Sequence, residues 1–205
     1  MGAESSSLFD GVSIKGWCAV GGGEFPSRSW SVEDGCLKAL GSKPAFQDIR
    51  TVEMFEDFAL EFEWKITPDG NSGVKYLIYR EDVWKPAGSS EFHARGRGFE
   101  YQIADGTSAR KELEAAGGLY EFQAPLQFNA RPAGEFNEAR IVRRGTAIEH
   151  WLNGVRVVAI RLDTPEIMER MRSRKVPTDL PRRTPIVLQN HGSEAWFRRV
   201  KIRSL

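Results

Sequence analysis

The sequence predicts an all-β protein, either a sandwich or a barrel of antiparallel strands. Segments in which polar and apolar residues alternate recur along most of the chain, and this alternation is typical of strands with one buried face. Turns rich in Gly and Asn, such as PDGNSG, NG and NHGSE, separate these segments. Helical patterns are scarce. Together the three observations favour packed sheets over an α/β architecture.

Eight segments carry the strand pattern: residues 58–66, 72–79, 98–104, 139–144, 147–152, 155–160, 185–190 and 195–202. The pair Asn153-Gly154 predicts a tight hairpin, because a type I′ turn needs positive φ at both central positions. A short helix is expected over residues 164–174, where a Thr cap precedes a Pro. Residues 80–98 form a long Gly-rich excursion that we expect to overhang the site. Residues 172–183 are basic and interrupted by Pro, as in a solvated loop.

Length and composition set the remaining limits. We expect one β-sandwich domain over residues 1–205, with residues 1–7 disordered. A net charge of +1 gives no reason to expect nucleic acid or a membrane surface as partner. The two cysteines, Cys18 and Cys36, are expected to be free buried thiols. The first residues show no signal-peptide pattern, so we expect a periplasmic or secreted protein if a signal was removed, and a cytoplasmic one otherwise.

The strand over residues 98–104 places a carboxylate and an amide, Glu100 and Gln102, on one face and apolar residues on the other. The apolar rows that we expect to be buried are Phe99, Tyr101 and Ile103; Leu60, Phe62, Trp64 and Ile66; Val74, Tyr76 and Ile78; and Ile186 and Leu188. The polar residues opposite these rows are Glu61, Glu63, Lys65, Lys75, Gln189 and His191. We therefore predict a concave polar face that forms a ligand groove. An ordinary charged surface is the alternative, which we favour for Glu61 and Lys65.

The Asn153-Gly154 hairpin also predicts the environment of His150. Its register pairs Leu152 with Val155 and His150 with Val157, so His150 shares a mostly apolar face and is expected to be a satisfied core histidine.

On the other face of this hairpin, Trp151 lies opposite Arg156. There its ring can stack on a sugar or contact a cation.

The turn over residues 68–74 contains Asp69, Asn71 and Ser72. Their oxygens can hold a divalent cation such as Ca²⁺, but the acidic spacing of an EF-hand is missing, so a plain turn is favoured and no cofactor is assigned.

Several enzyme classes are excluded because the sequence lacks their motifs. The sequence has no GxGxxG after a strand, no P-loop, no GxSxG and no HExxH. It also lacks the Glu-x-Asp-x-x-Glu strand of retaining sandwich glucanases of the laminarinase type, which weakens ordinary two-carboxylate glycoside hydrolysis.

Seven stretches of the sequence match one family in the same order. They are LFDGVSIKGW (8–17), WSVEDGCLKA (30–39), FEDFALEFEWKI (55–66), GNSGVKY (70–76), GFEYQIAD (98–105), GEFNEARIVRRGTAIEHWLNG (134–154) and IVLQNHGSEAWFRRVKIR (186–203). The chain resembles the 3-keto-disaccharide hydrolase family over nearly its whole length. The resemblance implies a concanavalin-like jelly-roll sandwich of two antiparallel sheets. The sequence departs from the family pattern at two places. Lys75 interrupts a run that is usually apolar and ends in Arg, and Asn190 stands where the family commonly has aspartate.

The resemblance also implies activity on glycosides oxidised at C3 by a partner sugar 3-dehydrogenase. A 3-keto group acidifies the C2 proton, so a base can abstract it and the C1 leaving group can be eliminated, followed by hydration. In that chemistry Glu100 is the candidate base or acid, and Lys75 or His191 stabilises oxyanion charge. Asn71 and Gln102 orient the substrate. The further expected substrate-binding residues are Gln189, Glu63, Trp151 and Asp105.

Two other functions stay open at this point. A lectin-like module on the same sandwich would hold a glycan through Trp151, Trp84 and the polar face without turnover. A protein-interaction role has only the basic region over residues 170–183 behind it.

Overall fold

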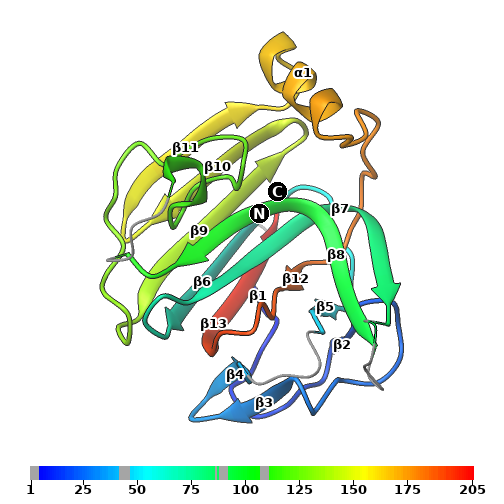
Figure 1. Ribbon diagram of the computed structural model, residues 1–205, viewed down its shortest axis with the longest axis vertical. Helices are drawn as coiled ribbons and strands as arrows, with labels where there is room; N and C mark the ends of the chain where they lie inside the picture. The colour runs from blue at the N-terminus through cyan, green and yellow to red at the C-terminus, as the bar shows by residue number, and fades with distance from the viewer. Residues whose placement is uncertain (1–4, 42–46, 86, 88–91, 107–110) are drawn as a thin grey trace.

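The computed structural model is a sandwich of two antiparallel sheets with one helix (Figure 1), and it describes residues 5–41, 47–85, 87, 92–106 and 111–205. The eight-stranded sheet has the order β11 (Val155–Arg161), β10 (Ala147–Leu152), β9 (Asn137–Arg144), β6 (Phe58–Ile66), β13 (Ala195–Ser204), β4 (Cys36–Ala39) and β3 (Trp30–Glu33), and β1 (Ser6–Ser7) also pairs with β13. The five-stranded sheet has the order β2 (Trp17–Ala19), β5 (Ile49–Thr51), β12 (Val187–Leu188), β7 (Asn71–Trp84) and β8 (His93–Ala104). The predicted all-β sandwich with one short helix is confirmed.

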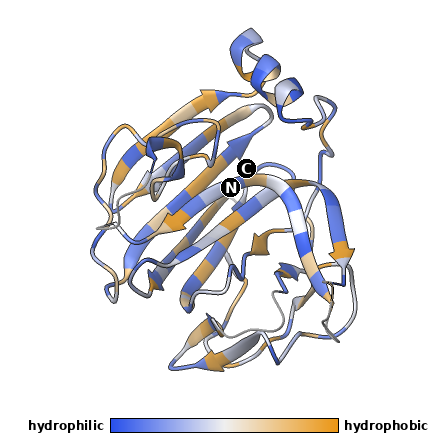
Figure 2. Ribbon diagram, in the orientation of Figure 1, coloured by the Kyte–Doolittle hydropathy of each residue, from blue (hydrophilic) through white to orange (hydrophobic). Residues whose placement is uncertain are grey.

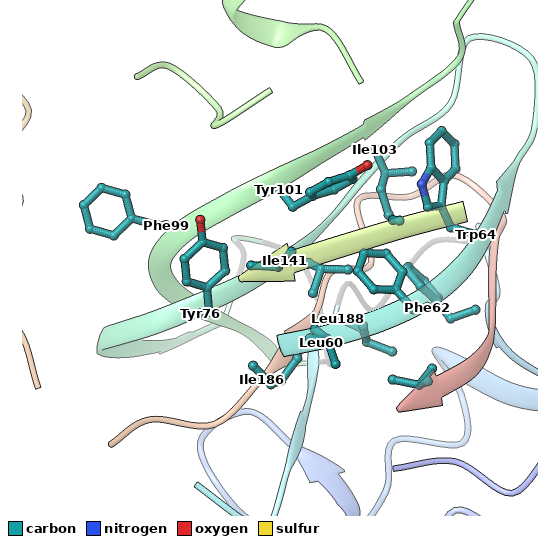
Figure 3. Close-up of a cluster of buried hydrophobic side chains, with 14 of the residues drawn as sticks. Leu60, Phe62, Trp64, Tyr76, Phe99, Tyr101, Ile103, Ile141, Ile186 and Leu188 are labelled. Atoms are coloured by element: carbon teal, nitrogen blue, oxygen red, sulfur yellow. The ribbon is translucent and has the colours of Figure 1, made fainter. Parts of the chain in front are cut away.

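The core lies between the two sheets, where the alternating apolar rows meet (Figures 2 and 3). Leu60, Phe62 and Trp64 of β6 point inward toward Tyr101 and Ile103 of β8, and all five are buried. The ring centroids of Phe62 and Tyr101 are 5.6 Å apart in an edge-to-face arrangement. The predicted core rows of these two strands are therefore confirmed.

Ile78 is buried, as predicted, but it does not share the face of Val74 and Tyr76 in this core. Leu77 has a φ of 51°, and the β7–β8 register shifts between Tyr76 and Arg80. This bulge reverses the alternation, so Leu77 joins the main core while Ile78 packs with Val187 in a second cluster on the other face of the sheet.

Residues 80–84 and 93–98 are strands and not part of the irregular loop that the sequence predicts, while residues 86 and 88–91 lie outside the described residues. β7 continues to Trp84 and β8 begins at His93, and the two strands form a long, curved pair (Figure 1). Few alternating apolar residues mark this stretch, because it extends beyond the sandwich and has less core to cover.

The Asn153-Gly154 turn forms as predicted, with φ values of 48° and 82°. The predicted partner of His150 is wrong, because a bulge in β11 after Arg156 shifts the register and pairs His150 with Val158. His150 is nevertheless fully buried, as expected. Its Nδ1 donates to the Gly117 carbonyl at 3.0 Å, which leaves Nε2 to accept from the Tyr76 hydroxyl at 2.7 Å. Burial lowers the pKa of His150 to about 4.

The free edge of β8 is covered by the chain that follows it. A 3₁₀ helix, η1 (Glu112–Glu114), leads into residues 117–120, which run along β8: the Gly117 N–H donates to the Gln102 carbonyl and the Tyr120 N–H to the Glu100 carbonyl. The helix α1 (Pro165–Ser173) holds the end of this segment in place, because Arg170 donates a hydrogen bond to the carbonyl of Phe122, two residues after Tyr120. The edge is thereby protected from pairing with other chains.

Three further expectations concern the termini and the cysteines. Ser6 and Ser7 pair with Ile202 and Lys201, so the predicted disorder is wrong for these two residues. Cys18 and Cys36 are free, as expected, although only Cys36 is buried. Among the described residues, no helix is long and apolar enough to cross a bilayer.

Candidate active site

A cavity of about 320 Å³ lies on the outer face of the five-stranded sheet. β7 and β8 form its floor, the residues after β12 form one wall, and the segment over β8 with the residues after α1 forms the other. The residues that line it are Asn71, Lys75, Tyr79, Arg95, Gly96, Arg97, Gly98, Glu100, Gln102, Tyr120, Glu121, Phe122, Arg174, Val176, Gln189 and His191. The predicted polar groove therefore includes six of the predicted residues: Asn71, Lys75, Glu100, Gln102, Gln189 and His191.

A buried charge network lies at the centre of the floor. Lys75 is opposite Glu100 in the β7–β8 register, and its Nζ is 3.9 Å from Glu100 Oε2. The same Nζ donates to Asp48 Oδ2 at 3.2 Å. With the Gln189 amide oriented to satisfy both neighbours, its oxygen accepts from Lys75 Nζ at 3.0 Å and its nitrogen donates to Glu100 Oε1 at 3.3 Å. One ammonium is thus shared by two carboxylates and an amide.

The Glu100 carboxyl has an unusual protonation equilibrium. Its side chain is 13% exposed, and burial raises its pKa to about 7 even though Lys75 and Arg95 act to lower it. Asp48 and Glu121 add to the rise. A carboxyl with a pKa near neutrality is able both to accept and to return a proton, which is the property of a general acid–base group.

Gly73 leaves the space that Glu100 occupies. A Cβ at this position would lie 2.3 Å from Glu100 Oε1 and 2.7 Å from its carboxyl carbon. The carboxylate therefore lies across the backbone of β7, beside Gln189, whose N–H donates to the Gly73 carbonyl. Any side chain here would displace the carboxylate from its partners.

Gln102 and Asn71 provide amide groups beside the network. Gln102 Nε2 donates to Asn71 Oδ1 at 3.0 Å, and Gln102 is 1% exposed. Gln102 Oε1 has no hydrogen-bond partner among the described residues. An unsatisfied buried acceptor facing a polar cavity is suited to a ligand hydroxyl.

His191 and Tyr120 lie on opposite walls. His191 lies at the surface of the protein. Partial burial of its ring and the positive charges of Arg95 and Lys75 lower its pKa, so the imidazole is neutral at neutral pH. Tyr120 is half-buried, and its pKa is raised by burial and by the nearby carboxylates of Glu121 and Glu100, so its hydroxyl keeps its proton.

Three predicted site residues lie elsewhere. Glu63 and Trp151 are on the outer face of the eight-stranded sheet, on the far side of the core from Glu100, where they line a different cavity. The alternation of β6 and β10 was assigned correctly, but the sequence does not tell which sheet each strand joins. Asp105 is buried beside the turn before β7, where its Oδ2 accepts from the Asp69 N–H at 3.0 Å.

Three residues of the site are not predicted by the sequence pattern: Asp48, Arg95 and Tyr120. Asp48 precedes β5 by one residue and would have joined the polar face if the Asp48–Arg50 alternation had been recognised as a strand. Arg95 fell in the segment that was predicted to be irregular. No strand or motif pattern surrounds Tyr120, which reaches the cavity only because its segment pairs with the edge of β8.

The oxygens of the 68–74 turn do not fit a cation site. Ser72 Oγ donates to the Gln189 carbonyl at 2.7 Å, and Asn71 Oδ1 accepts from Gln102. Within the part of the chain that the structure describes, no group of three or more His, Cys, Asp or Glu residues is placed to hold a metal ion. A Ca²⁺ ligand set at this turn is therefore not supported by the residues present.

The chain is similar to known carbohydrate-active proteins. It is 28% identical to the 3-keto-disaccharide hydrolase of Bacteroides thetaiotaomicron, in an alignment that covers 97% of this chain and 78% of the relative. A crystal structure from Parabacteroides distasonis, provisionally described as a glycosyl hydrolase, has a TM-score of 0.81 at 26% identity and covers 98% of this chain and 94% of its own.

A more distant structure confirms the jelly-roll fold. The β-glucanase of Bacillus licheniformis has a TM-score of 0.54 at 9% identity, covering 100% of this chain and 99% of its own. At this identity the likeness concerns the fold alone. Residues 4–203 match the family described as the 3-keto-alpha-glucoside-1,2-lyase-like domain. The chain therefore belongs to this family and is a glycoside hydrolase-like, carbohydrate-active domain.

Proposed function

We propose that this protein cleaves the glycosidic bond of 3-keto glycosides by abstraction of the C2 proton and elimination of the C1 substituent. The observation that carries the proposal is the Glu100 carboxyl, which lies in a polar cavity and has a pKa of about 7. Abstraction of a proton next to a ketone needs a stronger base than an ordinary carboxylate, and a raised pKa supplies it.

The reaction balances without a covalent enzyme intermediate. Glu100 takes the C2 proton, the C1–C2 double bond forms, and the C1–oxygen bond breaks. The leaving oxygen receives a proton, which Glu100 can return because its pKa lies near neutrality. Addition of water across the double bond then completes a net hydrolysis, whereas release before this step makes the enzyme a lyase.

The remaining residues of the cavity hold and orient the sugar in this proposal. Gln102 offers a free acceptor and Asn71 a side-chain amide, both suited to ring hydroxyls. Gln189 orients the Glu100 carboxylate through one nitrogen. Lys75 is 5% exposed, and its Nζ lies 3.9 Å from Glu100 Oε2. We therefore assign Lys75 the role of lowering the pKa of Glu100. A sugar 3-dehydrogenase would supply the oxidised substrate.

The test uses a 3-keto disaccharide and its unoxidised parent, each with and without chelator, and follows release of the reducing sugar. We expect cleavage of the keto sugar only. Glu100→Gln should lower kcat/KM by about 10²- to 10⁴-fold, the range for a general acid–base group. Glu63→Gln, a carboxylate on the other sheet, is the matched control and should stay within about twofold of wild type, since it touches no group of the cavity. Equal rates for wild type and Glu100→Gln would contradict the proposal.

Two further readouts separate the mechanisms. In D₂O, elimination followed by hydration incorporates deuterium at C2 of the product faster than the free keto sugar exchanges, whereas direct hydrolysis does not. The kcat/KM of wild type should fall below pH 7 as Glu100 becomes protonated. A rate that is constant from pH 5 to 8 would exclude Glu100 as the base.

A glycan-binding role without turnover is the second candidate. The wall of the cavity includes the aromatic residues Tyr79, Tyr120 and Phe122, which could stack on a sugar. In that case neither sugar would be cleaved, but one of them would raise the thermal unfolding temperature of the protein.

A further inference from the structure

Elimination from a 3-keto sugar needs a group that stabilises negative charge on the C3 oxygen as the C2 proton leaves. Lys75 is the obvious cation on the cavity floor, but its Nζ already contacts Asp48, Gln189 and Glu100 within 3.9 Å. A cation held by two carboxylates and an amide has little charge left for a substrate oxygen. A different cation is therefore required.

Three arginines line the cavity, and two of them have carboxylate partners. Arg97 Nε is 2.6 Å from Asp82 Oδ2, and Arg174 pairs with Glu121. Arg95 makes no ion pair within the described residues, and its buried Nε has no hydrogen-bond acceptor there. Of the three, Arg95 alone has no carboxylate partner among the residues that the structure describes.

The position of Arg95 is supported from two sides. Its guanidinium carbon lies 5.6 Å from the centre of the Trp84 ring, a cation–π contact that restrains the side chain without neutralising it. The positive charge of Arg95 lowers the pKa of Glu100 and the pKa of His191. Arg95 therefore acts electrostatically at the same end of the cavity as the base.

We propose that Arg95 binds the C3 oxygen of the oxidised sugar and stabilises the enolate that forms when Glu100 removes the C2 proton. This assignment rests on the proposed function. In the step, the electron pair of the C2–H bond moves to the C2–C3 bond and the ketone π pair moves to the C3 oxygen, which the guanidinium neutralises. The pair then returns to expel the C1 substituent. An unoxidised sugar has no C3 carbonyl for this contact, so Arg95 also selects for the oxidised substrate.

The test compares Arg95→Met and Arg95→Lys with Arg80→Met, an exposed arginine of β7 that pairs with Asp82 and does not line the cavity. We expect Arg95→Met to lower kcat for the 3-keto disaccharide by about 100- to 1,000-fold, the cost of one lost oxyanion contact. Because the contact strengthens only as charge develops, KM should change less than about threefold. Added guanidinium should restore part of the rate of Arg95→Met and none of that of Glu100→Gln. Arg80→Met should match wild type.

The outcomes separate the two proposals. If wild type does not cleave the keto sugar, the proposed function fails and the role of Arg95 with it. If wild type does cleave it and Arg95→Met keeps its kcat, only the role of Arg95 is overturned. Should Arg95→Met prove unfolded by thermal denaturation, Arg95→Lys replaces it. That variant keeps a cation but loses the planar donor pair, so a kcat equal to wild type would reduce the role of Arg95 to a general positive field and overturn the direct contact.

Discussion

Glu100 and Glu63 are two carboxylates with the same exposure and opposite behaviour. Each side chain is 13% exposed. Burial raises the pKa of Glu100 to about 7, whereas at Glu63, which less of the protein surrounds, hydrogen bonds from Arg198 and Arg199 outweigh burial and the pKa is lowered. The exposed fraction of the side chain therefore does not by itself decide whether a carboxylate becomes a base. The amount of protein around the carboxylate and the hydrogen bonds that cations donate to it decide this.

On each sheet the backbone determines which cations lie beside the carboxylate. In β13 the register shifts between Arg198 and Lys201, and Arg199 has a φ of 51°. This bulge directs both guanidinium groups to Glu63, at 2.7 and 2.6 Å. On the five-stranded sheet, regular pairing brings one ammonium, Lys75, between two carboxylates. Two cations that donate hydrogen bonds hold Glu63 charged on one sheet, whereas on the other sheet Glu100 shares the Lys75 ammonium with Asp48.

The largest effect is expected when the Glu100 carboxylate is displaced without a change in charge. Gly73→Ala puts a methyl group 2.3 Å from Glu100 Oε1, so the carboxylate must move away from Gln189. We expect kcat/KM for the keto sugar to fall by about 100-fold or more, because a misplaced catalytic group loses its alignment. Circular dichroism and thermal unfolding should show a folded protein. Unchanged turnover in the folded variant would mean that the position of Glu100 is not critical.

Removal of the shared cation should cost the most stability. Lys75→Met leaves Asp48, which is fully buried, without its ion-pair partner, and we expect a loss of about 3–5 kcal/mol in the free energy of unfolding. Arg198→Met, the matched change at Glu63, leaves Arg199 in place and should cost less than about 1 kcal/mol. Urea unfolding measures both values. The double variant Lys75→Met/Asp48→Asn should recover part of the loss, and its failure to do so would place the cost outside the ion pair.

The pH dependence of stability should differ in sign at the two sites. The folded-state pKa of Glu100 is raised above its unfolded value of 4.5, so its ionisation removes stability as the pH rises from about 4.5 to about 7. We expect Glu100→Gln to be more stable than wild type at pH 8 by up to about 3 kcal/mol, and this gain to disappear near pH 4. Urea unfolding at the two pH values tests this. An equal difference at both would argue against the raised pKa.

Glu63→Gln should give the smallest effect and the opposite trend. The folded-state pKa of Glu63 is lowered, so its stabilisation is present above the unfolded pKa and is lost as the pH falls through the folded one. The variant should be less stable than wild type at pH 7 by less than about 1 kcal/mol, because Arg199 is 70% exposed and solvent screens the pair. The two proteins should become equal in acid. A gain in stability at pH 7 would show that burial wins at this site also.

The sequence by itself determined the elements that depend on local pattern. Alternation placed Leu60, Phe62 and Trp64 in the core, and the positive-φ requirement of Asn153-Gly154 placed a turn. Alternation also put Glu100, Gln102 and Lys75 on one face, and the apolar environment of His150 followed from the hairpin. These features follow from strand geometry, which acts over a few residues.

Only the tertiary structure decided which faces belong together. Glu63 and Glu100 have the same strand pattern, yet they lie on different sheets, because sheet assignment depends on long-range pairing that a period of two does not encode. The bulges at Leu77 and Arg199 reverse the alternation locally and are marked by no Gly or Pro. Asp48 and Arg95 are 47 residues apart in the sequence, and the fold brings both close enough to Glu100 to affect its pKa. The burial that raises the pKa of Glu100, and the charges that modify it, are therefore properties of the assembled sheet.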